Sequence, residues 1–343
     1  MIKNFEDIIT LQRGYDLPKQ NRTNGSFPLV AASGIADYIN EYKVKGPGVV
    51  TGRSGTIGNV FYVNENFWPL NTTLYVKDFH GNNPKYISYW LSRFDLSKYA
   101  NGASVPTLNR NELIGLKCLL HSKDEQQHIV NTIGSIDDLI ENYNHQIKKI
   151  LTIGELMVDS ASSKDDLTKY ANISLGGTPS RAHPEYWNGN IKWINSGAMT
   201  DSPAIMEQSE FITELGVQNS ATKCANEGDT VLSIIDPSTN KVSVVLEDKI
   251  YFNQSVICLS AKNKKDKGLI YFGGKKLVDE IKGYATGAAQ QSLNKEMFEI
   301  SEIHVPESHI INRLNELLER IIQLGKRIRL LSRLKIRLLS KYF

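Results

Sequence analysis

One twelve-residue phrase occurs twice in this chain. It reads YANGASVPTLNR at residues 99–110 and YATGAAQQSLNK at residues 284–295, so that Tyr, Ala, Gly, Ala, Leu and Asn recur at identical spacing. An internal repeat constrains a fold more strongly than composition does, because each copy should form the same supersecondary unit. We therefore expect two domains built on one plan.

The similarity extends to both sides of the phrase. Upstream, LQRG at 11–14 matches ISLGG at 173–177, and PLVAASG at 28–34 matches IKWINSG at 191–197. Short β-rich runs follow in each half, GVVTG, NVFYV and TTLYV in the first and DTVLSII, KVSVVL and QSVICLS in the second. Turn residues separate them, as is typical of strands. A helical stretch, NPKYISYWLSRF or LIYFGGKKLVDEI, then leads into the phrase. The fold class predicted is mixed α/β (α+β).

A long heptad pattern follows each copy. Apolar residues alternate at spacings of four and three, which is typical of a coiled-coil seam. We expect helices over 124–159 and 308–343, and hence domains over 1–123 and 160–307. Ser122 and Glu125 form a candidate capping box at the first helix. The predicted seam comprises Ile129, Ile133, Ile136, Ile140, Tyr143, Ile147, Ile150, Ile310, Leu314, Leu317, Ile321, Leu324, Ile328, Leu331 and Leu338.

Charge predicts how the two helices pair. Residues 124–159 hold seven acidic residues and two lysines, whereas 308–343 hold nine basic residues and two acidic ones. An antiparallel pairing with Ile136 opposite Leu331 brings opposite charges together, and such pairs select orientation. We expect a two-helix rod between two domains, with approximate two-fold symmetry. The expected neighbours are Asp137, Asp138 and Glu141 with Lys326, Arg327 and Arg329, Lys148 and Lys149 with Glu316 and Glu319, and Tyr143 with Leu324.

Composition excludes several classes of protein. Hydrophobic residues make up 41% of the 343 residues and charged residues 22%, which excludes wholesale disorder. Three scattered cysteines, Cys118, Cys224 and Cys258, fit neither a disulfide framework nor a zinc site and indicate a reducing cytosol. No apolar run is long enough for a signal peptide or a membrane span, so a cytoplasmic protein is expected.

The usual catalytic motifs are missing from the sequence. GRSGTIG at 52–58 is rich in glycine but lacks the lysine of a phosphate-binding loop, so a hairpin turn is expected there. DPST at 236–239 is expected to be a turn. There is neither an Asn/Asp-Pro-Pro-Tyr box for an amino-methyltransferase nor a metalloprotease or hydrolase motif. The sequence therefore predicts a non-catalytic chain without a metal site.

The chain resembles the specificity (S) subunit of type I restriction–modification enzymes over nearly its whole length. ISLGGTPSRAHPEYWNGNIKWINSGAM at 173–199 is similar to the opening of a target recognition domain, and GDTVLSIIDPSTNKVSVVLEDKIYFNQSVICLS at 228–260 to the strands that follow. GPGVVTGRSGTIGNVFYVNENFWPLNTTLYV at 46–76 resembles that region in another variety of the domain. The repeated phrase resembles the loop that closes such domains, and DEQQHIV at 124–130 the entry into the central helix.

The resemblance implies a function for each part. Each target recognition domain would read one half of a bipartite, asymmetric DNA site. The helices would set the spacer and dock two modification subunits, which methylate adenine with S-adenosylmethionine. Restriction subunits would join this core to translocate and cut DNA with ATP and magnesium. The chain itself would bind no cofactor and would not be catalytic.

Charge alone does not mark a DNA-binding face. Residues 1–123 carry 14 basic and 9 acidic residues, whereas 160–307 carry 15 and 19. Base readout is therefore expected from polar loops, because Arg pairs with guanine and Asn or Gln with adenine. The candidates are Lys19, Asn21, Arg22, Asn24, Arg53, Ser54, Ser104, Thr107, Asn109, Arg110, Thr178, Ser180, Arg181, His183, Ser238, Asn240, Lys241, Gln290, Gln291 and Lys295. The four tryptophans, Trp68, Trp90, Trp187 and Trp193, are expected in the domain cores.

Two alternative functions stay open at this point. The negative charge of the second half is compatible with an interaction protein, in which two modules on a rod bind peptides or glycans. The chain is also compatible with an S-like subunit of a restriction enzyme outside type I.

Overall fold

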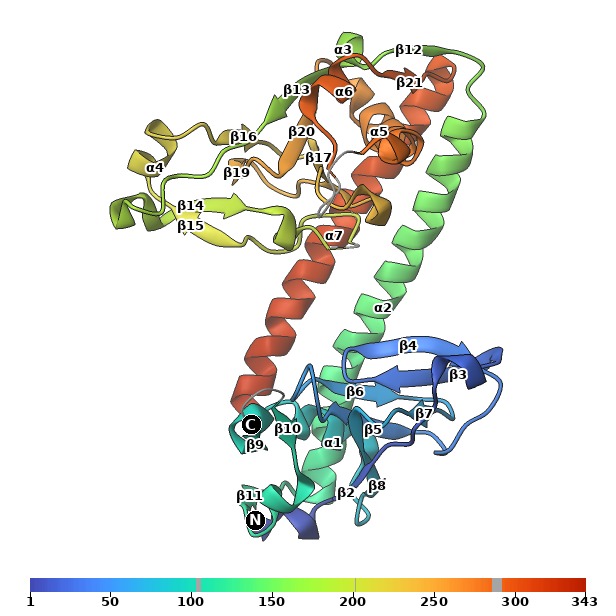
Figure 1. Cartoon of the computed structure of the whole chain (residues 1–343), viewed down its shortest axis with the longest axis vertical. Coiled ribbons are helices and arrows are strands. Elements are labelled where there is room, and N and C mark those ends of the chain that lie inside the picture. The colour runs from blue at the N-terminus through green and yellow to red at the C-terminus, as the bar shows by residue number, and fades with distance from the viewer. Residues whose placement is uncertain (103–105, 201, 286–291) are drawn as a thin grey trace. The chain divides into compact units, whose positions relative to one another are not determined.

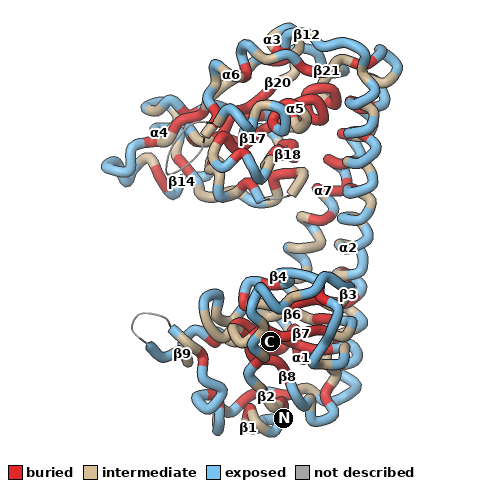
Figure 2. Tube along the Cα trace, turned by 45° about the vertical axis from the view of Figure 1, so that its right-hand side comes forward, coloured by how far each residue is buried: buried red, intermediate tan, exposed pale blue. Residues whose placement is uncertain are grey.

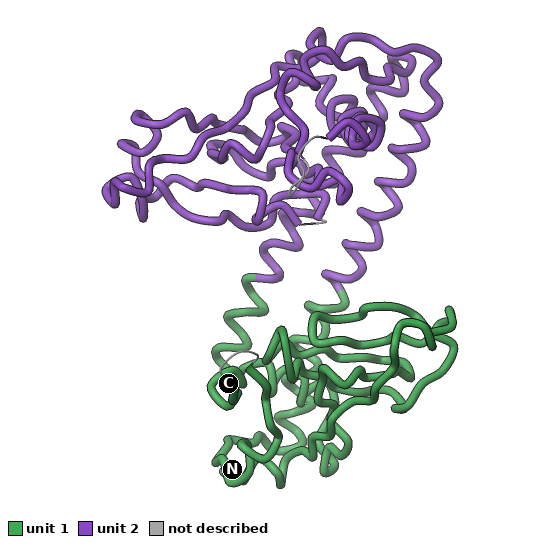
Figure 3. Tube along the Cα trace, in the orientation of Figure 1, with its two compact units in different colours: residues 1–138, 333–343 green, residues 139–332 purple. Residues whose placement is uncertain are grey.

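The computed structural model describes residues 1–102, 106–200, 202–285 and 292–343 (Figure 1). The chain forms two compact units (Figure 3). Unit 1 comprises residues 1–138 and 333–343, and unit 2 comprises residues 139–332. We call the α/β part of unit 1 domain 1 and that of unit 2 domain 2. The predicted mixed α/β fold with two domains and two long helices is confirmed.

Domain 1 is built on a four-stranded antiparallel sheet in the order β2–β8–β5–β6. A second sheet, β4–β3–β7, contains the parallel pair β3–β7, and β1 pairs with β11. The helix α1 covers the first sheet, and its buried face contributes Tyr86, Ile87 and Leu91 to the core. The bounds are β1 Ile2–Asn4, β2 Thr10–Arg13, β3 Asn24–Ala31, β4 Gly34–Ile39, β5 Gly48–Gly52, β6 Val60–Val63, β7 Trp68–Pro69, β8 Thr73–Asp78, α1 Pro84–Leu91, β9 Ala100–Asn101, β10 Thr107–Leu108 and β11 Lys117–Leu119.

Domain 2 repeats this plan. Its main sheet runs β13–β20–β17–β18, its second sheet β15–β14–β19–β16 contains the parallel pair β14–β19, and β12 pairs with β21. The helix α5 takes the place of α1 and is largely buried (Figure 2). The bounds are β12 Lys164–Asp166, α3 Leu167–Tyr170, β13 Ala171–Leu175, β14 Trp187–Ile194, β15 Glu210–Ile212, α4 Glu214–Gln218, β16 Lys223–Ala225, β17 Thr230–Ser233, β18 Val242–Val244, β19 Ile250–Phe252, β20 Val256–Ala261, α5 Lys267–Ile281, α6 Lys295–Glu299 and β21 Glu302–His304.

The repeated phrase docks in the same way in both domains. In domain 1 the Leu108 amide donates to the Arg53 carbonyl oxygen at 2.8 Å, and in domain 2 the Leu293 amide donates to that of Ile234 at 2.9 Å. Both leucine side chains are buried. The asparagine that follows each leucine caps a short helix through its side chain. The phrase therefore closes the two domains at equivalent places, although Gly287 lies outside the described residues.

The first strands are equivalent as well. The Gly14 amide donates to Thr73 at 3.0 Å, and the Gly176 amide donates to Val256 at 3.3 Å. A Cβ at Gly14 would lie 2.2 Å from the Leu70 carbonyl oxygen, and one at Gly176 would lie 2.2 Å from a carbonyl oxygen of β19. Because no side chain fits such a close backbone approach, glycine is required at both positions.

The helices α2 (Lys123–Asp159) and α7 (Ser308–Tyr342) each pass from one unit into the other (Figure 3). The predicted capping box is present, since the Ser122 amide donates to Glu125 Oε2 at 2.8 Å. Within unit 2, Arg320 Nη2 donates to Gln146 Oε1 at 3.2 Å. Within unit 1, Lys335 Nζ lies 2.5 Å from Asp137 Oδ1. From the first contact to the second, the residue number rises along α7, from 320 to 335, and falls along α2, from 146 to 137. The two helices therefore run antiparallel.

The apolar face of α7 is wider than a coiled-coil seam. Leu318 and Ile322, outside the predicted heptad positions, are buried. Both belong to the core of domain 2. The helix α7 also packs closely against α5, because a Cβ at Gly268 of α5 would lie 2.4 Å from the Leu314 carbonyl oxygen. Among the seam residues, Ile129, Ile133, Ile136, Ile147, Leu314, Ile321, Leu324 and Ile328 are buried and Ile140, Tyr143, Ile150, Ile310, Leu317, Leu331 and Leu338 are half-buried.

The expected ion pairs between the helices do not form among the residues that the structure describes, so that prediction is wrong. Two cations of α7, Lys326 and Arg329, pair with carboxylates of domain 2 and not with those of α2. The observed pairs are Lys326 with Glu227 at 2.7 Å, Arg329 with Glu247 at 2.5 Å, Lys335 with Asp137 at 2.5 Å and Lys85 with Asp138 at 3.5 Å. Glu316 pairs with Arg313 of its own helix, and Arg327 lies over the Tyr143 ring at 5.9 Å.

Truncation of either repeated leucine should destabilise its own domain. We expect Leu108→Ala and Leu293→Ala each to lower the free energy of unfolding by about 2–5 kcal/mol, the range for a buried leucine that leaves a cavity. Native-state hydrogen exchange in each domain would measure the loss. Leu119→Ala and Leu156→Ala, at exposed positions, are the controls and should change stability by less than about 0.5 kcal/mol. Equal effects in test and control variants would contradict the docking role of the phrase.

Candidate nucleic-acid interface

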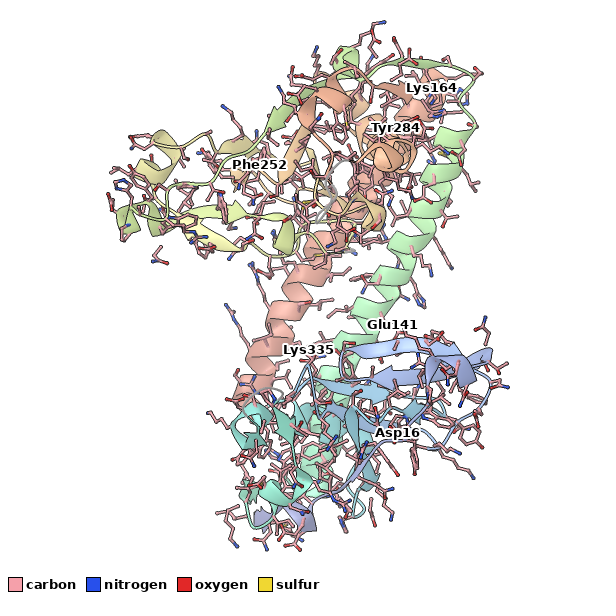
Figure 4. All side chains as sticks on the ribbon, in the orientation of Figure 1. Asp16, Glu141, Lys164, Phe252, Tyr284 and Lys335 are labelled. Carbon is pink, nitrogen blue, oxygen red and sulfur yellow. The ribbon has the colours of Figure 1, made fainter. Side chains whose placement is uncertain are left out.

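Domain 1 contains an open cleft of about 900 Å³ beside the repeated phrase. Its walls come from β2, β8, the segment after β5 and the phrase itself. The charged residues that line it are four cations, Arg13, Arg53, Lys77 and Arg110, and one acid, Asp16, which Figure 4 labels. The predicted candidates Thr107 and Asn109 lie in the same lining, with Gln12 and Asn101. The cleft therefore combines positive charge with uncharged hydrogen-bonding groups.

The backbone fixes where the arginines of the cleft stand. The Arg53 amide donates to the Thr72 carbonyl oxygen at 2.8 Å, which anchors the segment immediately after β5. Arg110 follows the capping Asn109, and its Nη1 donates to the Leu11 carbonyl oxygen at 3.0 Å. Both positions depend on the docked phrase, because Leu108 bonds to the carbonyl group of Arg53.

Arg13 keeps most of its hydrogen-bonding capacity. Its Nη2 lies 3.8 Å from Asp16 Oδ2, and the two side chains are 54% and 69% exposed. An exposed ion pair of this kind contributes little, because water screens it. The neighbouring Tyr15 hydroxyl lies 3.0 Å from that of Tyr75, and burial together with this contact raises the pKa of Tyr75. The Tyr75 phenol is therefore a neutral hydrogen-bonding group at physiological pH.

The remaining candidates of domain 1 are not part of the cleft lining. Lys19 and Asn21 are exposed in a short 3₁₀ turn, and Asn24 opens β3. The guanidinium group of Arg22 donates to the Leu17 carbonyl oxygen through Nε and Nη2 at 3.4 and 3.3 Å. Ser54, half-buried, forms an isolated bridge with Thr107.

In domain 2, Arg181 is held by its neighbours. Its Nη1 and Nη2 donate to the two carboxylate oxygens of Glu210 at 2.7 and 2.6 Å, and its guanidinium lies 3.5 Å from the centre of the Trp187 ring. The hydrogen bond from Arg181 lowers the pKa of Glu210. Trp187 Nε1 in turn donates to the Ser180 carbonyl oxygen at 3.2 Å. The arginine thus stabilises the loop before β14, and two of its donors are already used.

The other polar residues of this loop are also engaged. Thr178 Oγ1 donates to Gln254 Oε1 at 2.5 Å. His183 Nδ1 lies 3.0 Å from Glu185 Oε1, and its ring stacks on Tyr186 with centroids 4.8 Å apart. The loop presents an ordered polar surface.

The turn after β17 contains two residues in the left-handed conformation, Asp236 with φ 51° and Asn240 with φ 43°. Asp and Asn tolerate this region better than other residues with side chains. Ser238 Oγ donates to Asp236 Oδ1 at 2.5 Å, and Asn240 Nδ2 donates to the Lys275 carbonyl oxygen at 3.1 Å. Lys241 follows and is half-buried. The turn predicted at DPST is confirmed.

Four further candidates lie in or beside the repeated phrase. Ser104, Gln290 and Gln291 lie outside the described residues. Lys295 Nζ lies 2.7 Å from Glu299 Oε1 on the same helix, α6.

Sequence reasoning missed Arg13 and Lys77, which line the cleft together with predicted residues. A signal for Arg13 was present in the aligned segments LQRG and ISLGG, in which the residue before the matched glycine is Arg13 in one and Leu175 in the other. A charge that is present in one repeat and absent from the other marks an electrostatic difference between the domains.

The described part of the chain contains no cluster of His, Cys, Asp or Glu suited to a metal ion. Over the same residues no helix is long and apolar enough to cross a membrane. The three cysteines are free thiols. All four tryptophans are buried, as predicted.

A family model and a solved structure agree with this architecture. The model of the family described as type I restriction modification DNA specificity domain matches residues 1–152 and 166–335. The S subunit of a type I restriction-modification system from M. genitalium has the same fold, with a TM-score of 0.60 and 15% sequence identity over 100% of this chain and 96% of that one. The HsdS subunit from Thermoanaerobacter tengcongensis gives a TM-score of 0.36 and 13% identity over 100% and 96%. No curated protein matches the sequence.

Removal of the Glu210 charge should loosen the loop before β14. We expect Glu210→Gln to shift the Trp187 indole N–H resonance and speed its hydrogen exchange, because Arg181 loses its bidentate partner. In the unmodified chain the pKa of Glu210 is lowered, so the pair contributes stability above the usual glutamate pKa of about 4.3 and loses it as pH falls through the lowered value.

An NMR pH titration of the indole signal would test this prediction, with Glu185→Gln as the matched control in the same loop. The indole of the unmodified chain should respond only in acid, and that of Glu210→Gln should already be shifted at neutral pH. An unchanged indole resonance in Glu210→Gln would show that the ion pair does not order the loop.

Proposed function

Because the chain belongs to the type I restriction–modification DNA specificity family, we propose that each of its two domains reads one half of a bipartite DNA site. Members of this family recognise DNA sequence and are not themselves catalytic. The observation that carries this proposal is the duplicated domain. The same strand order in the main sheet and the same docked phrase occur in domains 1 and 2. Two copies of one reader support two half-sites, and their different loops support two different sequences.

The proposal assigns the spacer between the half-sites to α2 and α7. Both helices belong to both units, with 37 and 35 residues, or about 50 Å each at 1.5 Å per residue. Because the two helices pack against each other, an insertion or deletion of matching length in both would change the length of the pair as one element. The modification subunits would dock on these helices and hold S-adenosylmethionine, and restriction subunits would hold ATP and magnesium. Such a complex would act on DNA in the cytoplasm.

Base readout is proposed for polar loops of both domains. In domain 1 the cleft residues Asn101, Thr107 and Asn109 offer donors and acceptors suited to base edges. In domain 2 the loop before β14 and the turn after β17 offer ordered polar groups, including Ser180 and Ser238. A scaffold that binds peptides or glycans accounts less well for the chain, because the matched family is one of DNA specificity.

Methylome sequencing of the host with and without this chain would test the function. We expect adenine methylation at a motif of two constant parts separated by a fixed number of unspecified bases, and we expect it to vanish when the chain is deleted. A motif without a spacer, or methylation that survives deletion, would contradict the assignment of two half-sites to two domains.

Lengthening of both helices should change the spacer. Insertion of one heptad near Ile140 and one near Ile328 preserves the seam and adds about 10 Å, or roughly three base pairs at 3.4 Å each. Three base pairs also rotate the second half-site by nearly a third of a turn of ~10.5 base pairs. We expect methylation either at a longer spacer between unchanged half-sites or at no specific site, with the fold intact by circular dichroism.

A single-helix insertion near Ile140 is the matched control and should break the pairing of the helices. Methylation at the original spacer by the double insertion, at full rate, would show that the helices do not set the distance.

A further inference from the structure

The internal repeat allows the residues that line the cleft of domain 1 to be compared with the residues at equivalent positions in domain 2. Arg13 pairs with Leu74 in domain 1, and Leu175 pairs with Ile257 at the equivalent place in domain 2. Lys77 follows Val76 of β8, and Ser260 follows Leu259 of β20. Each of these two strands pairs with the strand that opens its domain.

The other two cations of the cleft can be placed in the same way. Arg53 and Ile234 are equivalent, since the carbonyl oxygen of each accepts a hydrogen bond from the repeated leucine. The amide of each also donates to the residue before the neighbouring strand of the main sheet, Thr72 before β8 or Ser255 before β20. Arg110 and Lys295 are the last residues of the two copies of the phrase.

Domain 2 thus lacks most of the charge that domain 1 collects here. Leu175, Ile234 and Ser260 are neutral, and Ile234 is 8% exposed in the core. The fourth equivalent, Lys295, is bound to Glu299 at 2.7 Å. Because the main sheets of the two domains pair their strands in the same order and register at these positions, the difference in charge lies in the side chains. In domain 1 the lining of the cleft contains four cations and one acid, Asp16.

The wider charge distribution follows the same division. Among the described residues, three of the 14 basic residues in 1–123 pair with a carboxylate, against eight of the 15 in 160–307. The eight are Lys164, Lys169, Arg181, Lys192, Lys275, Lys276, Lys282 and Lys295. More than half of the cations of domain 2 therefore pair within the chain, whereas most of those of domain 1 do not, and the pair that Arg13 makes with Asp16 is long and exposed.

We propose that Arg13, Arg53, Lys77 and Arg110 form a binding site for phosphate groups of the DNA backbone, and that domain 1 supplies most of the salt-dependent affinity for DNA whereas domain 2 supplies little. The inference rests on the proposed function. Four cations in one cleft repel one another unless an anion neutralises them, and Arg and Lys are the residues that bind phosphate. Contacts to uncharged base edges alone would not require this concentration of charge.

Measurement of salt dependence tests the proposal directly. The full chain, co-purified with its modification subunits, would be titrated by fluorescence anisotropy against two labelled 30-base-pair duplexes, one with the methylated motif and one scrambled. Each phosphate contact contributes about −0.9 to the slope of log K against log salt. For the triple variant Arg13→Gln, Arg53→Gln and Arg110→Gln we expect the slope to fall in magnitude by about 2–3. Affinity for both duplexes should fall by the same factor.

Two variants control for charge and folding. Arg13→Lys, Arg53→Lys and Arg110→Lys keep the charge and should keep the slope. Lys223→Gln, Lys264→Gln and Lys265→Gln remove three exposed charges from domain 2 and should change the slope by less than about 1. If the glutamine triple fails to fold, as judged by thermal melting, Lys77→Gln alone should reduce the slope by about 1.

Each remaining outcome overturns one statement. Equal loss of slope in both glutamine triples would show a general effect of net charge and would refute the cleft. Weaker binding of the motif duplex alone would show base readout in its place. An unchanged slope, in a complex that still distinguishes the two duplexes, would refute this inference and leave the proposed function standing. If the complex of the unmodified chain does not distinguish the motif duplex from the scrambled duplex, the proposed function itself is refuted.

Discussion

The burial of two long apolar stripes is the constraint on which the rest of this structure depends. Neither α2 nor α7 can bury its stripe alone, and each is covered in part by the other helix and in part by a domain. In unit 2 this requires α7 to present Leu318 and Ile322 as well as Leu314 and Ile321. The helices are therefore parts of the domain cores, and a change in one of them acts directly on the domain that it supports.

The repeated phrase anchors the end of each domain by burying an apolar residue. The leucine of each copy is buried, and its amide bonds to the segment after the third strand of the main sheet. Polar residues before and after this leucine are thereby held beside the strands at fixed positions. A rigid anchor with variable neighbours is a general way to place recognition residues on loops, and here one anchor serves two domains with different neighbours.

The two domains share a backbone plan and differ in electrostatics. Domain 1 gathers cations in a cleft, whereas domain 2 uses its cations in internal pairs such as Arg181 with Glu210 and Lys276 with Asp159. Electrostatic attraction to phosphates is independent of sequence, and specificity comes from contacts to bases. A reader with one strongly and one weakly charged domain can therefore separate affinity from discrimination along a single chain.

The sequence by itself determined the repeat, the class of fold, the position of both long helices and their antiparallel direction, because periodicity, turn residues and charge patterns are local or additive properties. It also indicated the capping box at Ser122 and the buried tryptophans. Only the tertiary structure decided the ion pairs of α7, since Arg329 could reach a carboxylate of α2 or Glu247 of domain 2, and the choice depends on which surface packs closer. The same holds for Arg13 and Lys77, which are distant in sequence from Arg53 and Arg110. Sheet pairing brings these four residues to one cleft, and the spacing of residues along a chain carries no information about which strands will pair.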